Sequence, residues 1–314
     1  MTNSSKLKGD AAEREAAQLI AELTGHPARR KLGAGRAEVA VIHPIRVLSF
    51  GAGVQSSYVA RASLLGDLPP FDHVVFADTG DEPDDVMENV AWWADRFKVE
   101  GVPVHVVRKP KSISETVYET LDGGRSGVPI PVFIRNLRGH AGQMGRQCTS
   151  SWKVEQIKRV LRQVADVPHR HKHITDALVE QTIGISWDEA VRMRDAPYPW
   201  VRNAYPLVDD RITRWECIRV MASDDRFPDP PRSACWHCPY RSAAEWRHLR
   251  DHQPESWAKA VKLDHALRRD GSPLRGDCYL HPSLTPLDEV DLSTEEDRGQ
   301  GVLWDAECEG MCGL

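Results

Sequence analysis

Short apolar runs alternate with helical stretches in the front half of the chain, and this alternation limits the fold more than any other feature. Runs rich in β-branched residues occupy 45–50, 73–78 and 102–109. Stretches with helical periodicity, 55–66 and 82–97, lie between them. Strand, helix and strand at this spacing predict a parallel sheet with crossover helices. We therefore expect an α/β fold, to which a helix at 152–164 and a buried strand at 181–186 would add.

The link between the first predicted strand and its helix is the segment SFGAGVQSS, residues 49–57. Glycines there permit positive φ and a close approach of the backbone, and serine hydroxyls can donate hydrogen bonds. A helix N-terminus at the carboxyl edge of a parallel sheet attracts anions. The segment is neither a P-loop ending in Gly-Lys-Ser/Thr nor a G-x-G-x-x-G motif, so alone it suits an anion site and a plain turn equally. Its candidate ligand-binding residues are Ser49, Gly51, Gly53, Gln55, Ser56 and Ser57.

Polar residues follow two further predicted strands at the same edge of the sheet. The second strand ends in FADTGDEP, which brings Asp78, Thr79 and Gly80 there. An acidic cluster facing a phosphate loop suits a ribose contact or Mg²⁺ shared with a triphosphate, and the alternative is a solvated acidic turn. The segment SWDEAVRMR, which follows the strand at 181–186, adds Asp188, Glu189 and Arg192.

Four motifs in this order, SFGAGVQSS, FADTGDEP, RQCTSSWKVEQIKRVL and GISWDEAVRMRD, resemble the PP-loop ATP pyrophosphatase superfamily, and in particular its phosphoadenosine phosphosulfate reductase-like branch. The resemblance spans roughly residues 45–245 and the extreme C-terminus. It implies a flavodoxin-like nucleotide-binding fold and a substrate that is activated or presented as an adenylate. ATP, or an adenylated nucleotide, is then expected on residues 49–57, with Mg²⁺ near Asp78.

The chain departs from the familiar S-G-G-x-D-S form of the PP-loop. It has Phe50 and Gln55 where the family often has Gly and Asp. Sulfonucleotide reductases, which do not cleave ATP, also depart from that form. Nucleotide binding is therefore expected, while Gln55 leaves the cleavage of ATP open.

Seven cysteines supply the second kind of chemistry, and six of them follow residue 200. A C-x-x-C pair binds a soft metal or does redox chemistry. In adenosine phosphosulfate reductases a Cys-Cys pair before K-V-E-P and a later C-x-x-C hold a [4Fe–4S] cluster. Cys148 matches the first of that pair, Thr149 replaces the second, and Cys235 and Cys238 match the C-x-x-C.

Three cysteinates would leave one iron without a protein ligand. In the sulfur-transfer branch of the superfamily such an open iron holds hydrosulfide. Alternatively, Cys217 or Cys308 supplies a fourth thiolate. A structural zinc site built from Cys235, Cys238, Cys308 and Cys312 is the competing hypothesis.

The last residues, ECEGMCGL, resemble the E-C-G-[IL]-H tail whose cysteine attacks sulfur in the reductases. Cys312 aligns with that cysteine, but the preceding acidic residue and the final histidine are missing. Cys308 does follow a glutamate, Glu307. These cysteines are candidate nucleophiles on a tail that could move onto bound substrate, or else a surface or metal-bound pair.

The stretch 121–148 is expected to be a long loop. Arg138 and Arg146 on it are candidates for binding phosphate or sulfate, and a solvated basic loop is the alternative. Trp187 and Trp200 could stack on a base, although burial of tryptophan is more common. His237, inside the C-x-x-C, is expected to face solvent.

Composition limits the remaining choices. The net charge of −5 gives no sign of nucleic-acid binding through bulk charge. Neither a membrane span nor a signal peptide is expected, which favours a cytoplasmic protein. We predict an N-terminal helical extension (1–40), a nucleotide-binding domain (41–205) and a Cys-rich, mostly helical C-terminal region (206–314). Thr213 to Glu216 and Ser242 to Glu245 are predicted capping boxes at helix starts of that last region.

These patterns favour an adenine-nucleotide-dependent sulfur transfer enzyme. The acceptor, for which a nucleobase or nucleic acid is one choice, would be adenylated with release of pyrophosphate. Sulfide or a cysteine desulfurase would be the sulfur donor. The alternative enzyme is a sulfonucleotide reductase that forms sulfite with a tail cysteine and a thioredoxin. A binding module stabilised by zinc is a third class.

Overall fold

The computed structural model describes residues 43–293, apart from 125–126, 137, 169–176, 271 and 275, together with 18, 28–30, 39–41 and 297. Of the predicted N-terminal helical extension (1–40), the structure describes residues 18, 28–30 and 39–40, and the tail with Cys308 and Cys312 lies outside the described residues. Within the extension, β1 (Ala28–Arg30) and β2 (Val39–Val41) pair as antiparallel strands.

A five-stranded parallel sheet forms the centre of the protein, as the alternating pattern predicted. Its order is β5-β4-β3-β8-β9. The strands are β3 (Ile45–Ser49), β4 (His73–Asp78), β5 (Val104–Arg108), β8 (Val179–Ile183) and β9 (Val201–Ala204). The chain starts in the middle at β3, moves out to β5, and then crosses to β8. The connections therefore reverse direction between β3 and β8, which is where ligands bind in open α/β sheets.

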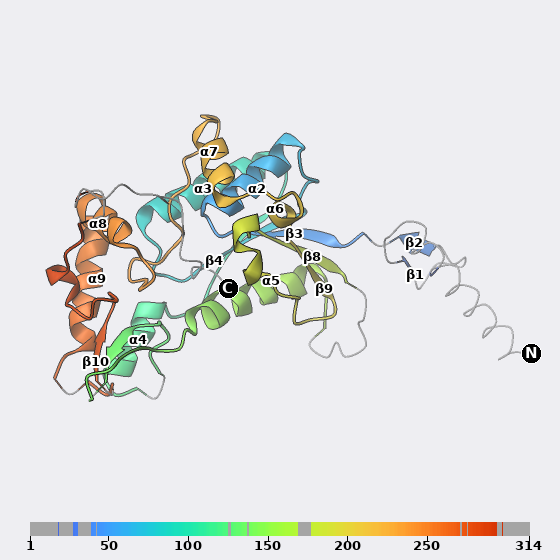
Figure 1. Cartoon of the computed structure of the whole chain (residues 1–314). Helices are drawn as coiled ribbons and strands as arrows, with labels where there is room; N and C mark the ends of the chain where they lie inside the picture. The colour runs from blue at the N-terminus through green and yellow to red at the C-terminus, as the bar shows by residue number, and fades with distance from the viewer. Residues whose placement is uncertain are drawn as a thin grey trace, which may run out of the picture.

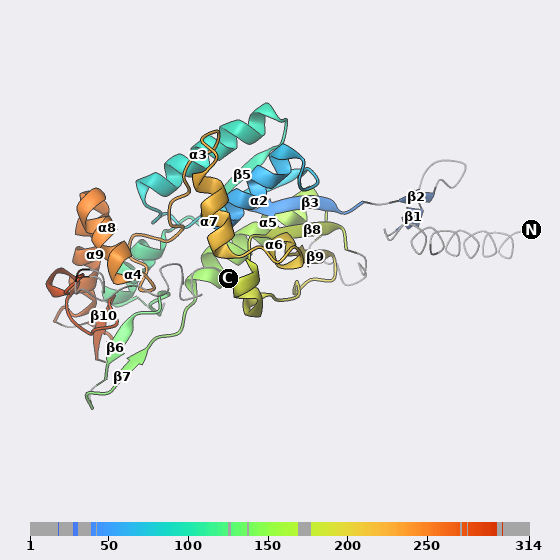
Figure 2. The same cartoon turned by 45° about the horizontal axis from the view of Figure 1, so that its top comes forward.

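Helices cover both faces of this sheet (Figures 1 and 2). One face packs against α2 (Val54–Leu65), α3 (Asp84–Val99) and α7 (Arg214–Ala222), and the other packs against α5 (Glu155–Val164). Successive strand residues point to opposite faces. Leu48 accordingly joins the core of the first face with Trp93 of α3, while Val47 joins that of the second with Leu161 of α5. The observed fold is thus α/β with a parallel sheet flanked by helices.

A second core lies beside the sheet and draws on distant parts of the chain. It contains α4 (Ile113–Leu121), α8 (Ala243–His252), α9 (Pro254–Leu267) and an antiparallel sheet of order β10-β6-β7. The strands of that sheet are β6 (Phe133–Arg135), β7 (Ala141–Gln143) and β10 (Asp277–Tyr279). The short helices are η1 (Thr149–Val154), η2 (Trp187–Arg192), α6 (Pro206–Asp209) and η3 (Leu287–Glu289). Because α7 packs on α2 while α4 packs on α9, the two cores do not separate at residue 205.

The stretch 121–148, expected to be a loop, contains the β6–β7 hairpin, which projects at the lower left of Figure 2. Its partner strand β10 lies about 140 residues further along, so no local pattern indicates the pairing. Both predicted capping boxes, at Thr213 and Ser242, are confirmed. No helix among the described residues is both long and apolar enough to cross a membrane.

Candidate functional site

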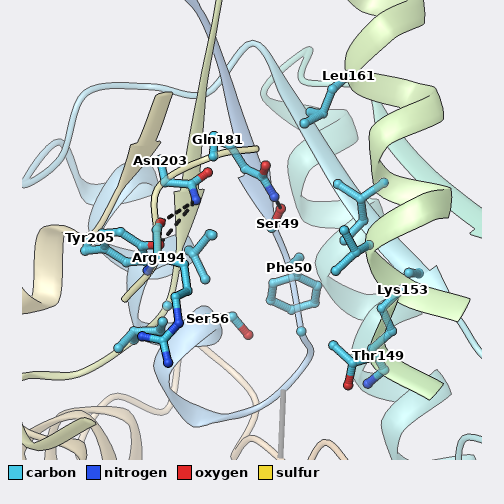
Figure 3. A pocket seen from close by; sticks show the side chains of 18 of the residues that line it. Ser49, Phe50, Ser56, Thr149, Lys153, Leu161, Gln181, Arg194, Asn203 and Tyr205 are labelled. Atoms are coloured by element: carbon cyan, nitrogen blue, oxygen red, sulfur yellow. Dashed lines mark hydrogen bonds between the residues drawn. The ribbon is translucent and has the colours of Figure 1, made fainter. Parts of the chain in front are cut away.

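A cavity of about 340 Å³ opens at the carboxyl edge of the parallel sheet, where the connections reverse direction (Figure 3). Ser49 and Phe50, at the end of β3, and Ile183 and Gly184, at the end of β8, form its floor. The first turn of α2 lies at one side. The cavity therefore occupies the position that the order of the strands predicts for a ligand.

The loop between β3 and α2 is held in a defined conformation. Ala52 has φ of 58°, in the left-handed region that glycine usually occupies, and its carbonyl accepts a hydrogen bond from Asn89 (3.0 Å). Gly53 precedes α2, and no side chain caps the first turn of that helix. Uncapped N–H groups at a helix N-terminus bind anions through hydrogen bonds and the helix dipole. The start of α2 therefore has the uncapped N–H groups that an anion site needs.

Gly184 lets the end of β8 approach the start of α2. A Cβ atom at Gly184 would lie 2.8 Å from Ser56 N, 3.0 Å from Ser56 Cα and 3.0 Å from the carbonyl carbon of Gln55. All three are backbone atoms, which cannot rotate away. Only glycine therefore fits between strand and helix at this point.

The remaining walls differ in character. Apolar side chains of α5, including Ile157 and Leu161, form one side, and Arg194, Asn203 and Tyr205 form the opposite side. Tyr205 donates a hydrogen bond to the Arg194 carbonyl (2.6 Å), and Gln181 Nε2 donates to Ser49 Oγ (2.7 Å) across the floor. An apolar wall facing a few fixed polar groups is typical of small-molecule sites.

The structure brings six of the predicted cofactor-binding residues to this cavity. They are Ser49, Gly51, Gly53, Gln55, Ser56 and Arg192. Ser57 does not line it, because its side chain is fully buried beneath the loop.

Gln55 is held in a network that crosses the cavity's edge. Its Nε2 donates to Glu189 Oε2 (3.1 Å), and its Oε1 accepts from Arg214 (2.8 Å). Arg192 forms an ion pair with the same Glu189 oxygen (2.8 Å). Asp188 lies outside the cavity and accepts a hydrogen bond from the Arg214 backbone (2.8 Å). Glu189 and Asp188 thus fix the walls and do not line the space.

The FADTGDEP segment reaches the cavity through Phe76 and Ala77, whereas Asp78, Thr79 and Gly80 do not line it, contrary to the expectation for these three residues. Asp78 accepts a hydrogen bond from the Gly80 N–H (2.7 Å) and faces Arg108 at 3.7 Å. Gly80 has φ of 81° and is closely packed against Arg108. Asp78 therefore closes a turn outside the cavity, and Mg²⁺ near it stays a prediction.

Thr79 points instead toward the cysteines. Its buried hydroxyl lies 3.2 Å from Cys235 Sγ and donates to Glu82 Oε1 (3.0 Å). Cys148, Cys235 and Cys238 line a second cavity together, of about 50 Å³. Cysteine thiols are the soft donors that an iron–sulfur cluster takes, so three cysteines lining one space fit such a group by their chemistry.

The two cavities share part of their walls. Thr149, Lys153 and Ser233 line both of them. Ser233 Oγ also donates to the carbonyl of Gly51, which ties the segment before the C-x-x-C to the loop between β3 and α2. A group held by the cysteines would thus be next to a ligand in the larger cavity.

Lys153 is the main charge at this shared wall. Burial lowers the pKa of its ammonium group, but the Glu82 carboxylate and the three cysteines outweigh burial and raise the pKa above its ordinary value. Its Nζ lies 4.0 Å from Glu82 Oε1. Burial, together with Glu82, raises the pKa of the Cys235 thiol well above its ordinary value in spite of Lys153. The Lys153 side chain is therefore a cation that can balance negative charge on the cysteines or on a phosphate.

Three other expectations need correction. Cys217 is not a fourth ligand, because α7 buries it in the core against α2, where burial first and then Asp188 raise the pKa of its thiol to about 12. Arg138 lies exposed in the β6–β7 turn, away from both cavities, whereas Arg146 lines the cysteine cavity. His237 does not face solvent, since only 1% of its side chain is exposed and its Nε2 lies 3.0 Å from Asp81 Oδ2.

Trp200 is fully buried and stacks on Tyr198, while Trp187 is exposed and lines neither cavity. Sequence reasoning missed Lys153, Gly184 and Ser233. Lys153 and Gly184 stand inside motifs quoted above, and only their position beside backbone or cysteines from elsewhere in the chain reveals their part in the site.

Among the described residues, no three His, Cys, Asp or Glu side chains are close enough together to hold one metal ion. The tail cysteines Cys308 and Cys312, which the zinc hypothesis requires, lie outside that part of the chain. No model of a known protein family matches the chain, and no curated protein matches it either.

Proposed function

We propose that the protein binds an adenine nucleotide in the larger cavity and carries out sulfur chemistry at Cys148, Cys235 and Cys238. The observation that carries this proposal is the wall of Thr149, Lys153 and Ser233, which the two cavities share. A nucleotide site and a cluster of thiols in direct contact are what sulfur transfer to an adenylated substrate requires. The flavodoxin-like arrangement and the cytoplasmic, reducing setting belong to the same proposal.

The nucleotide would lie with its phosphates on the first turn of α2 and its base against the apolar wall of α5. Backbone N–H groups after Gly53 and the hydroxyl of Ser56 would donate to the phosphates. Ile157 and Leu161 would cover one face of the base. Lys153 would stabilise the negative charge that develops where nucleotide and sulfur meet.

The three cysteines would hold an iron–sulfur cluster. Bound there, such a cluster supplies an iron that can carry sulfide or exchange an electron. Lys153 would offset the negative charge of the thiolates. With the acceptor adenylated, sulfide would attack the adenylated carbon and form a C–S bond. The C–O bond to AMP would break, and AMP would leave with the electron pair of that bond.

The test is a pair of measurements on protein purified without oxygen. We expect iron and acid-labile sulfide at about four each per chain, and ATP or AMP binding by calorimetry. Ala196→Trp, which would fill the larger cavity, should abolish nucleotide binding and leave the iron content unchanged. A colourless protein that binds neither iron nor nucleotide would overturn the proposal.

Reduction of a sulfonucleotide is the second candidate, since Arg146 beside the cysteines suits a sulfate group. Incubation with adenosine phosphosulfate, or its 3′-phosphorylated form, and dithiothreitol distinguishes the two. Sulfite would identify the reductase. Acceptor-dependent release of pyrophosphate from ATP would identify the transferase.

A further inference from the structure

A polar pair interrupts the apolar face of the sheet that forms the floor of the larger cavity. Gln181 Nε2 donates a hydrogen bond to Ser49 Oγ (2.7 Å), and both residues line the cavity. Val47 and Val179 lie two residues before them on β3 and β8 and pack into the core beneath α5, so the pair points to the same side. Strands of a parallel sheet covered by helices are usually apolar, so a glutamine there needs an explanation.

One half of the Gln181 amide has a partner in the protein and the other half does not. Nε2 is bound to Ser49, whereas Oε1 accepts no hydrogen bond from the residues that the structure describes. The side chain is partly exposed, and in Figure 3 it extends from β8 toward α5. Because Ser49 holds the amide nitrogen, the oxygen is an acceptor at a fixed position on the floor of the cavity.

Gln181 lies at a distance from α2 that suits the base of a nucleotide. Gly184, three residues further along β8, is the point where the strand approaches Ser56 N. A strand rises about 3.3 Å per residue, which places Gln181 about 10 Å from the start of the helix. Phosphate and base edge are separated by a similar distance in a nucleotide. Figure 3 shows Gln181 and Leu161 at one end of the cavity and Ser56 toward the other.

A fixed acceptor at this end of the cavity distinguishes between purines. Adenine has an amino group at C6, which donates hydrogen bonds, whereas guanine has a carbonyl oxygen there, which accepts them. The amino group would satisfy Oε1 of Gln181. A carbonyl oxygen, or a hydrogen atom, at C6 would leave Oε1 without a donor in a site that has excluded water. Sites built around such a hydrogen bond discriminate strongly against ligands that cannot form it.

We propose that Gln181 is a specificity-determining residue of the nucleotide site, and that its Oε1 accepts a hydrogen bond from the 6-amino group of the base. Ser49 is the positioning residue, because its hydroxyl fixes which half of the amide faces the base. The ligand class is therefore the nucleotides of 6-aminopurines. This inference rests on the proposed function, since it requires the phosphates at the start of α2 and the base against α5.

The experiment is calorimetric titration with AMP and with purine riboside 5′-monophosphate, which lacks only the 6-amino group. Wild-type protein should bind AMP about 5- to 150-fold more tightly. Gln181→Leu should bring this ratio close to one, and Ser49→Ala should lower it, because the amide is then able to turn over. Gln181→Arg, which offers only donors, should prefer inosine monophosphate to AMP. Gln163→Leu, the matched control at an exposed position of α5, should keep the wild-type ratio.

Wild-type protein that binds both nucleotides equally would refute the role of Gln181 and leave the proposed nucleotide site standing. Protein that binds neither would contradict both proposals. A wild-type preference for AMP that persists in Gln181→Leu and in Ser49→Ala would show that another group reads the base. The Ser49→Ala ratio decides the question even if substitutions at position 181 prevent folding, which thermal unfolding would reveal.

Discussion

Replacement of Gly184 by alanine tests whether the close approach of β8 to α2 shapes the proposed nucleotide site. The added Cβ would lie 2.8–3.0 Å from three backbone atoms of Gln55 and Ser56. Carbon atoms in ordinary contact are about 3.5–4.0 Å apart. The end of the strand or the first turn of the helix must therefore move by about 0.5–1 Å.

The expected loss of stability follows from the effect of overpacking in other proteins. Forcing an extra methyl group into a packed site is destabilising by about 1–3 kcal/mol. For a protein of this size, that lowers the melting temperature by about 2–12 °C. If the first turn of α2 moves, its N–H groups leave the position proposed for the phosphates. Returning the turn to that position on binding would then cost the same 1–3 kcal/mol, which weakens nucleotide binding by about 5- to 150-fold.

Thermal unfolding with and without ATP, together with calorimetric titration of ATP, would measure both effects. Gly145→Ala is the matched control, because nothing lies within 4 Å of its added Cβ. We expect Gly145→Ala to match the wild type in both measurements. Equal stability and equal ATP affinity in the two alanine variants would refute the reasoning about Gly184.

Three further predictions concern groups around the site. Gln55→Glu sets a second carboxylate against Glu189 and should lower the free energy of unfolding by about 1–3 kcal/mol in urea titrations; adding Glu189→Gln should restore most of it. Lys153→Met leaves the buried Glu82 carboxylate without its cation. Its melting temperature should therefore fall below that of the double variant Lys153→Met with Glu82→Gln. Equal melting temperatures of the two variants would contradict a stabilising ion pair between Lys153 and Glu82. The folded state holds the Cys217 proton to about pH 12, against 9.0 for an ordinary thiol. The Cys217 thiol therefore contributes fully to the free energy of unfolding below pH 9, and this contribution is lost as the pH rises toward 12. Between pH 8 and 10.5 the free energy of unfolding of the wild type should fall by on the order of 1–2 kcal/mol more than that of Cys217→Ala. Denaturant titrations at the two pH values would detect this difference.

The parts of the fold that local patterns encode were predictable. Alternating apolar runs indicated β3, β4 and β5, and a strand followed by a glycine-rich segment indicated a ligand edge at Ser49. The order of the strands then brings the ends of β3 and β8 together, although they are more than 130 residues apart.

The rest depended on contacts between distant segments. His237 has the sequence setting of a solvent-facing residue in a C-x-x-C turn, and only Asp81, 156 residues earlier, accounts for its burial. Cys217 is chemically the same as Cys235, yet one turns into the apolar core beneath α7 and the other into the cavity. Asp78 and Thr79 are neighbours in one motif but point to different partners. Periodicity assigns a residue to a face and does not name what lies opposite.

The π-helical turn η1 shows how one local irregularity links the two cavities. It runs from Thr149 to Val154, directly after Cys148, and leads without a break into α5. Such turns insert an extra residue into a helix and are frequent at functional sites. Thr149 and Lys153 both lie on this turn, and both line the larger cavity and the cysteine cavity. A regular α-helical turn in its place would rotate these side chains by about 100° per residue removed, so Cys148 and Lys153 would no longer keep their present directions relative to each other. The irregular turn therefore lets one helix serve both halves of the proposed reaction.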